Sequence, residues 1–181
     1  MFDPYHFLPL RLHQTSVEIK DTFIYKSTDI ATYIIALAND RRISINMTKV
    51  QKLLYIIYGA YLRIYGERLL NEHPQAWPYG PVFPTTRNKL LKQELSLISA
   101  DDIVKEERKK ILKDTKLNKV VDFVFNHFGG WNAGQLSEWS HSDGSPWYQT
   151  TNRNGFKWGD VIPDHLIKGY FNSIISVKSE S

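Results

Sequence analysis

The segment from Ser137 to Ser145 gathers the residue types that hydrolases use for nucleophilic attack, because it places His141 and Asp143 among several serines. Triad members, however, usually meet from separate segments around an oxyanion hole, and this chain has no G-x-S-x-G turn to expose a nucleophile. We therefore interpret Ser140, Ser142 and Ser145 as helix caps and expect His141 to bond locally to the backbone. No catalytic residue is predicted.

The sequence also lacks the motifs of a metal site or a cofactor site. The six histidines include no pair at the i, i+4 spacing of a helical zinc site, and the absence of cysteine removes thiolate ligands and disulfides. Gly129-Gly130 matches neither the P-loop nor the dinucleotide-binding pattern. We therefore expect no metal and no cofactor, and a binding protein rather than an enzyme. An unrecognised hydrolase is the least favoured alternative.

The composition is that of a folded domain. Of 181 residues, 42% are hydrophobic and 23% are charged, which is typical of a globular chain with one sizeable core. The net charge of +4 is mild, whereas a nucleic-acid-binding domain usually concentrates basic residues on one face. No apolar run approaches the roughly 18 residues of a membrane span, and the first residues do not resemble a signal peptide. These features predict a cytoplasmic protein.

One long helix organises the predicted fold. Thr48 and Gln51 have the spacing of a capping box, and Asn46 is a rival N-cap. Gly66 supplies the stop, since glycine adopts the left-handed conformation at little cost. The sequence therefore predicts a helix of about 18 residues that ends at Tyr65.

The apolar side chains of this helix cover well over half of its circumference, which indicates a central helix that is packed on several sides. The middle of the apolar arc is expected in the core and consists of Leu54, Ile57 and Tyr61. A narrow strip is left for water or a close neighbour and consists of Lys52, Ile56, Gly59 and Arg63. A long amphipathic surface helix is the alternative.

Shorter amphipathic patterns predict a single, mainly α domain around this helix. Further helices are expected from Ser27 or Thr28 to Asn39, from Thr85 or Thr86 with Leu90, Leu91 and Leu95, from Lys116 to Phe128, from a cap at Asn132 to Ser140, after Ser145-Pro146, and after Pro163. The charged stretch from Lys105 to Lys113 is a solvated helix or a mobile connector.

The first 26 residues form an N-terminal extension in this interpretation, and residues 27–178 form the domain. Apolar side chains alternate from Val17 to Tyr25, which suggests a short strand interrupted by Asp21. The extension is either loose or an arm that docks on the domain or on a partner.

The segment from Trp77 to Pro84 is rich in aromatic residues, and its prolines exclude a helix. We expect a short irregular or β segment near residues 67–84 that folds onto the core or presents a preset surface to a partner. Charged residues of the helix strip add to this candidate surface. The candidate partner-binding residues are Lys52, Arg63, Trp77, Tyr79, Pro81 and Phe83.

Three motifs together resemble the Panacea family of SocA-like, GepA-type phage-associated antitoxin domains. They are K-V-Q-K-L-L-Y at residues 49–55, W-P-Y-G-P-V at residues 77–82, and L-S-E-W-S-H at residues 136–141 followed by Pro146-Trp147. Ser140 departs from the threonine that is frequent in the family. The resemblance spans roughly residues 28–175 and implies a fold-holding role for Leu54, Tyr55, Gly80, Val82, Leu136, His141, Pro146 and Trp147.

The resemblance implies an antitoxin that binds and neutralises a cognate toxin protein, usually encoded by an adjacent gene. A relative in this family delivers its toxin to a ClpXP-type protease as an adaptor, so such a protease is a second candidate partner. Homo-oligomerisation stays open, and no membrane partner is expected. The alternative function is a phage-associated DNA-binding regulator, although the central helix is too apolar to read base edges.

Overall fold

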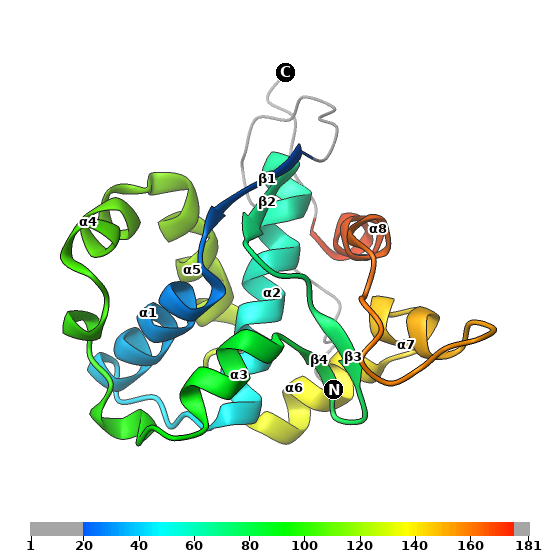
Figure 1. The fold of residues 1–181 in the computed structure, drawn as a ribbon, viewed down its shortest axis with the longest axis horizontal. Helices are drawn as coiled ribbons and strands as arrows, with labels where there is room; N and C mark the ends of the chain where they lie inside the picture. Colours follow the sequence, from blue (N-terminus) through cyan, green and yellow to red (C-terminus); the bar gives the residue numbers. More distant parts are fainter. Residues whose placement is uncertain (1–19, 176–181) are drawn as a thin grey trace.

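The computed structural model describes residues 20–175, and most of this part of the chain is helical (Figure 1). The predicted mainly α fold is therefore confirmed. Its helices are α1 (Ser27–Asp40), α2 (Met47–Tyr65), α3 (Pro84–Leu90), α4 (Lys105–Lys113), α5 (Thr115–Phe128), α6 (Ala133–His141), α7 (Pro146–Thr151) and α8 (Asp164–Ile174), with short 3-10 helices η1 (Leu95–Leu97) and η2 (Ala100–Asp102). Within the described range, none of the helices has the length and hydropathy of a membrane span.

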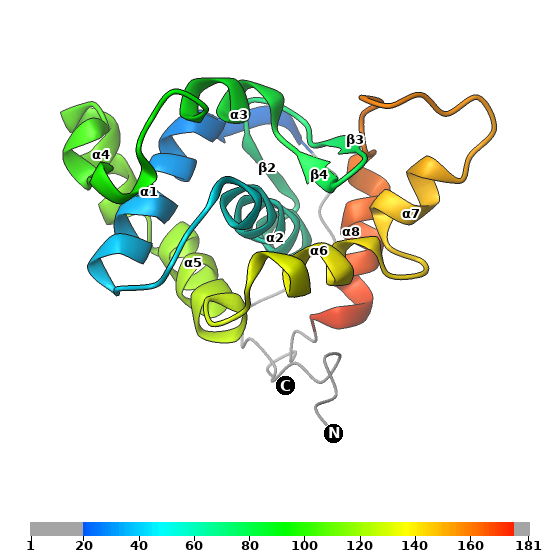
Figure 2. The same ribbon diagram turned by 90° about the horizontal axis from the view of Figure 1, so that it is seen from below.

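Helix α2 is the axis of the fold. Of the two candidate N-caps, the structure uses Asn46, whose side chain accepts the N–H of Lys49 at 2.9 Å. Gly66 ends the helix with a φ of 66°, the left-handed conformation that glycine tolerates. Every residue from Lys49 to Ile64 is buried, because other helices and strands surround α2, as the view nearly along its axis shows (Figure 2). The predicted central helix is confirmed.

The strip on α2 is almost closed by neighbouring elements. Lys52 and Arg63 expose only 1% and 9% of their surfaces. Gly59 packs against the Phe171 ring of α8, and the side chain of Lys52 reaches β4. Lys52 and Arg63 therefore do not lie on an open surface, and of water and a close neighbour it is the neighbour that covers the strip. Two carbonyls of the hairpin solvate the amine of Lys52 in the interior.

Four short strands accompany the helices. β1 (Lys20–Tyr25) pairs in parallel with β2 (Glu67–Leu70), and β3 (Gln75–Trp77) pairs with β4 (Gly80–Val82) as an antiparallel hairpin. An isolated bridge from Gln75 to Val161 adds the segment before α8 to the other side of β3. The predicted β segment near residues 67–84 therefore consists of β2, β3 and β4.

The end of the predicted N-terminal extension docks on the domain. β1 lies against β2, and the Tyr25 hydroxyl donates to the Asp114 carboxylate at 2.9 Å. The docking alternative is thus correct for residues 20–25, whereas residues 1–19 and 176–178 of the predicted units lie outside the described residues.

The remaining helices occupy the predicted positions with small shifts. Helix α3 begins at Pro84 and stops at Leu90, so it leaves Leu91 half exposed and Leu95 in η1. The stretch from Lys105 to Lys113 is a helix with a largely exposed surface. Of the two alternatives, a solvated helix and a mobile connector, the solvated helix is therefore correct. Helix α4 lies on one side of α2, and α7 and α8 lie on the other (Figures 1 and 2).

Candidate functional site

The side chain of Lys52 lies at a buried junction between α2, the β3–β4 hairpin and α6. Its Nζ donates to the carbonyl oxygens of Tyr79 at 2.6 Å and Pro81 at 3.2 Å. These two carbonyls belong to the residues before and after Gly80. The side chain of Lys52 therefore fixes the backbone of the hairpin on both sides of Gly80. The two acceptors offset part of the cost of burying the amine.

Gly80 fits this junction because it has no side chain. Its φ is 101°, and a Cβ at this position would lie 2.6 Å from Lys52 Nζ and 2.9 Å from Ser140 Oγ. Ser140 is buried and donates to the Ser137 carbonyl at 2.9 Å. The hairpin therefore approaches α2 and α6 as closely as a bare backbone allows.

Local serine bonds hold the α6–α7 connection. Ser145 Oγ donates to the Ser140 carbonyl at 3.0 Å and accepts the Tyr148 N–H at 3.1 Å, which makes it the N-cap of α7. Ser142 Oγ donates to the Trp139 carbonyl at 2.9 Å. Ser145 is the N-cap of α7 and Ser142 is the C-cap of α6, as the sequence predicts, whereas Ser140 lies within α6 and bonds the carbonyl one turn back.

His141 and Trp147 join α6 and α7 to the hairpin. Their rings meet edge to face with centroids 4.1 Å apart, and Trp147 Nε1 donates to the Trp77 carbonyl at 2.8 Å. The Nε2 atom of His141 is buried without a hydrogen-bond partner among residues 20–175, so this nitrogen does not make the predicted bond to the backbone. Burial and the charge of Lys52 both lower the pKa of His141.

The three sequence motifs therefore converge on one place. The first contributes Lys52 from α2, the second contributes Gly80 from the hairpin, and the third contributes Ser140, His141 and Trp147. The model of the family described as "Antitoxin SocA-like, Panacea domain" matches residues 50–148, which is more than half of the chain. The chain belongs to this family.

A curated relative extends the match. Antitoxin SocA from Caulobacter vibrioides (strain NA1000 / CB15N) is 29% identical over 156 residues, and the match covers 78% of this chain and 80% of the relative. No solved structure matches the chain. Membership of this Panacea family gives the chain the general role of an antitoxin, and that role implies a cognate toxin as its partner.

The Panacea motif residues occupy the interior. Leu54, Tyr55, Gly80, Val82, Leu136 and Pro146 are buried, and His141 and Trp147 are half-buried. In the described range no group of three acidic, histidine or cysteine side chains is placed to hold a metal ion. The junction shows how the motifs hold the hairpin against α2 and α6.

Three polar residues that were not predicted as site residues also position the hairpin and its neighbours. Gln51 Oε1 accepts the Phe83 N–H at 2.7 Å, and Glu72 accepts from both Ser27 and Thr86. Asp164 accepts the Tyr58 hydroxyl at 2.5 Å and lies 3.3 Å from His73 Nδ1. Gln51 was detectable as a polar residue within a run of apolar positions, whereas Glu72 and Asp164 carry no local signal.

The candidate partner-binding residues divide into two groups. Lys52, Arg63, Pro81 and Phe83 are buried, and their side chains are not available to a partner in this structure. Trp77 is half-buried and Tyr79 exposes 79% of its surface. Other aromatic side chains extend the exposed part, and we define the aromatic surface by Trp77, Tyr79, Trp147, Tyr148 and Trp158.

The aromatic surface spans three segments that pack together. The Trp147 ring on α7 lies 6.4 Å from that of Trp158, between centroids, and its indole donates to the backbone of Trp77 on β3. Trp158 and Tyr148 expose 57% and 38% of their surfaces. Figures 1 and 2 both place α7 beside the β3–β4 hairpin, at the end of the molecule opposite α4.

We expect the stability contributed by Lys52 to depend on pH. Burial lowers the pKa of Lys52 from 10.5 to about 7 in the folded protein. Between these values the unfolded chain binds more protons than the folded protein, so the free energy of unfolding rises with pH. The stability difference between the wild type and Lys52→Met should therefore increase from pH 7 toward pH 9, by up to about 1 kcal/mol per pH unit. Thermal unfolding of both proteins checks this, and a constant difference contradicts it.

Proposed function

We propose that this chain neutralises a cognate toxin protein by binding it directly, and that the toxin docks on the aromatic surface. The observation that carries the proposal is the exposure of Tyr79 and Trp158 on segments with a fixed backbone. Lys52 of the buried junction holds the carbonyl of Tyr79, and backbone hydrogen bonds of Gly159 and Asp160 to Ala76 hold the segment of Trp158. Protein interfaces are enriched in Trp, Tyr and Arg, and a few such residues supply most of the binding energy.

The surface is prepared for binding by its own packing. The hairpin pairs Gln75 with Val82 and Trp77 with Gly80, and Lys52 fixes the carbonyls at its end. A partner therefore orders little backbone when it docks, which reduces the entropic cost of association. The Arg87 guanidinium lies 5.2 Å from the centroid of the Trp77 ring and adds a positive charge at the rim, which suits an acidic group on the toxin.

Truncation of Tyr79 is expected to weaken toxin binding by about tenfold or more, because exposed aromatic anchors typically contribute more than 1 kcal/mol. The candidate toxin is a neighbouring reading frame that is lethal when expressed alone. Binding of the purified pair by calorimetry and rescue of toxin-expressing cells measure the effect of Tyr79→Ala and of Trp158→Ala.

A matched control comes from the other end of the molecule. Leu97 in η1 exposes 78% of its surface, almost the same fraction as Tyr79, and precedes α4 rather than α7. Leu97→Ala should leave affinity and rescue unchanged. Wild-type affinity in folded Tyr79→Ala and Trp158→Ala proteins would place the interface elsewhere, and the absence of any complex with the wild type would reject direct neutralisation.

The same cells distinguish simple blocking from delivery to a protease. Under the proposal, binding alone neutralises the toxin, and rescue persists in cells that lack a ClpXP-type protease. Loss of rescue in those cells, with toxin binding retained in vitro, would instead assign this chain the adaptor role.

A further inference from the structure

The segment before α8 forms an open edge beside the β3–β4 hairpin. Gln75 of β3 lies between Val82 of β4 and Val161 of this segment, and both pairings are antiparallel. The residues on either side of Val161 make the hydrogen bonds to β3, at 2.8 and 2.9 Å. Because bonding alternates along an antiparallel strand, the N–H and C=O of Val161 point away from the hairpin. Neither group has a hydrogen-bond partner among residues 20–175.

The opposite edge of the hairpin is closed by side chains of α2. Lys52 donates to the carbonyls of Tyr79 and Pro81, and Gln51 accepts the Phe83 N–H. These bonds occupy the backbone groups on the outer side of β4. A further strand therefore cannot pair with β4, whereas the edge at Val161 is a template for one.

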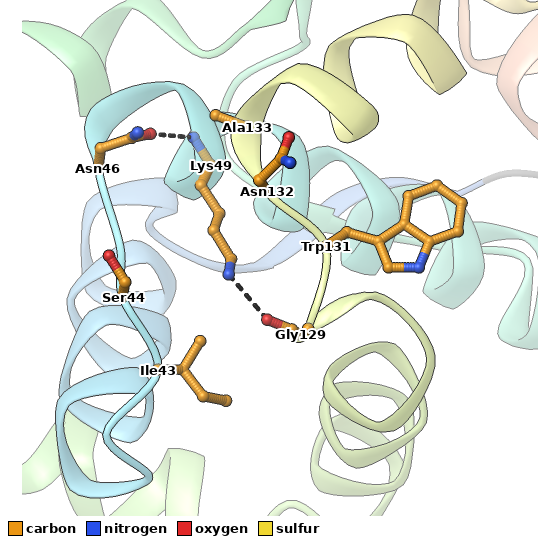
Figure 3. Close-up of a pocket in the computed structure, with 9 residues that line it drawn as sticks. Ile43, Ser44, Asn46, Lys49, Gly129, Trp131, Asn132 and Ala133 are labelled. Carbon is orange, nitrogen blue, oxygen red and sulfur yellow. Dashed lines mark hydrogen bonds between the residues drawn. The ribbon is translucent and has the colours of Figure 1, made fainter.

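Another polar side chain of α2 closes backbone in the same way. Lys49 crosses the pocket between the α1–α2 and α5–α6 connections and donates to the Gly129 carbonyl at 2.7 Å (Figure 3). In the part of the chain that the structure describes, the backbone of Val161 receives no bond of this kind.

The open edge continues the aromatic surface. Ala76 and Ile162 lie on the inner face of the hairpin and its neighbouring segment and are fully buried. Trp77 and Val161 lie on the outer face, since side chains alternate along a strand. Val161 exposes 43% of its surface, and Trp158, three residues earlier, exposes 57%. A strand added at Val161 therefore runs beside the exposed aromatic rings.

We propose that the toxin binds with an extended segment that pairs with the backbone of Val161 and so adds a strand to the hairpin. The inference rests on the proposed function, because it assigns the kind of segment that the aromatic surface receives. Main-chain bonds to Val161 supply affinity, and alternate side chains of the toxin segment contact Trp77 and Trp158 and supply specificity.

The charge of this edge favours an acidic toxin segment. The stretch from residue 153 to residue 160 carries two basic side chains, Arg153 and Lys157, and one acidic side chain, Asp160. Arg153 pairs with Asp160 at 2.6 Å, which leaves the exposed Lys157 as the excess charge. Opposite charges on paired strands stabilise the pairing, so a carboxylate of the toxin segment fits beside Lys157.

Hydrogen exchange in the full chain tests the pairing, with the purified product of the neighbouring lethal reading frame as the toxin. The Val161 amide should exchange at least tenfold more slowly in the complex than in the free protein. The rate at Ile162 should change much less, because its N–H already donates to β3. An unprotected Val161 amide in the complex overturns the proposal. Protection without the toxin at high protein concentration also overturns it, since a second copy then occupies the edge.

Two variants locate the bond. Val161→Pro removes the outward N–H, and proline is tolerated on an edge strand where that N–H faces solvent. It should weaken toxin binding by about tenfold without loss of stability, because the facing carbonyl of the toxin loses its donor. Val161→Thr keeps the N–H and the branched side chain and should bind like the wild type.

The outcomes separate this inference from the proposed function. Wild-type affinity in folded Val161→Pro, with weaker binding by Tyr79→Ala, overturns the strand pairing and retains the aromatic surface. Equal losses in Val161→Pro and Val161→Thr assign the effect to the side chain and also overturn the pairing. Wild-type affinity in Tyr79→Ala, Trp158→Ala and Val161→Pro rejects both proposals.

Discussion

Alanine in place of Gly59 is expected to destabilise this protein by about 3 kcal/mol, although alanine is the better helix former. A Cβ at this position would lie 2.2 Å from Cε2 of Phe171, where α8 crosses α2. The ring of Phe171 is buried and packs edge to face against Tyr55, Trp139 and Tyr170, so these neighbours restrict its movement. The two helices must separate, or the aromatic cluster must repack. Chemical denaturation of the variant measures the loss.

A second glycine makes the control. Gly169 lies within α8, and a Cβ there would meet nothing within 4 Å. The same change, Gly169→Ala, should be neutral or should stabilise the protein by up to about 1 kcal/mol, since only helix propensity changes. If Gly59→Ala lowers the free energy of unfolding and Gly169→Ala does not, the loss at Gly59 is due to the steric clash and not to helix propensity.

A double mutant identifies the neighbour responsible. Phe171→Val alone should be destabilising because it leaves a cavity, but it should cost much less in the Gly59→Ala background. A coupling energy above about 1 kcal/mol is expected. Additive effects of the two changes would show that α8 is not the limiting contact.

The helical part of the fold was predictable because its signals are local. The caps Asn46, Asn132 and Ser145 and the stop at Gly66 each act within one turn of the residue that reveals them. The breadth of the apolar arc correctly predicted a central α2. The predicted helix boundaries differ from the observed ones where tertiary contacts set the end of a helix. The apolar periodicity placed Leu91 on a helix, but α3 ends one residue earlier, at Leu90.

The candidate site was less predictable, because exposure depends on neighbours that are distant in the sequence. Lys52 was expected at the surface because it lies on the narrow strip outside the apolar arc of the helix. Two carbonyls of the hairpin, 27 and 29 residues later, solvate it in the interior instead. Phe83 belongs to the same aromatic segment as Tyr79, yet it is fully buried while Tyr79 is exposed. Trp158 joins the aromatic surface through a contact with Trp147 that no local pattern indicates.

Alanine in place of Gly80 should be the second strongly destabilising change, with a loss of about 3–9 kcal/mol. Its φ of 101° is unfavourable for any residue with a side chain and costs on the order of 1–3 kcal/mol. The new methyl group would also displace Lys52 Nζ, and loss of its bonds to Tyr79 and Pro81 leaves buried carbonyls unpaired, at about 1–3 kcal/mol each. Thermal and chemical unfolding of Gly80→Ala measure the sum.

A substitution at Gly144 separates the backbone strain from the collision with Lys52. Its φ is 77° and a Cβ there meets nothing within 4 Å, so Gly144→Ala should show the backbone strain without the collision. Removing the obstructing amine gives the complementary test. In a Lys52→Ala background the carbonyls are already unpaired, so Gly80→Ala should cost only the strain that Gly144→Ala shows in the wild type and the close contact with Ser140 Oγ. Equal destabilisation by Gly80→Ala with and without Lys52 would show that the glycine is required for its backbone conformation and for the contact with Ser140, and not for Lys52. The expected non-additivity instead identifies the contact of Gly80 with Lys52 as the reason this hairpin carries a glycine.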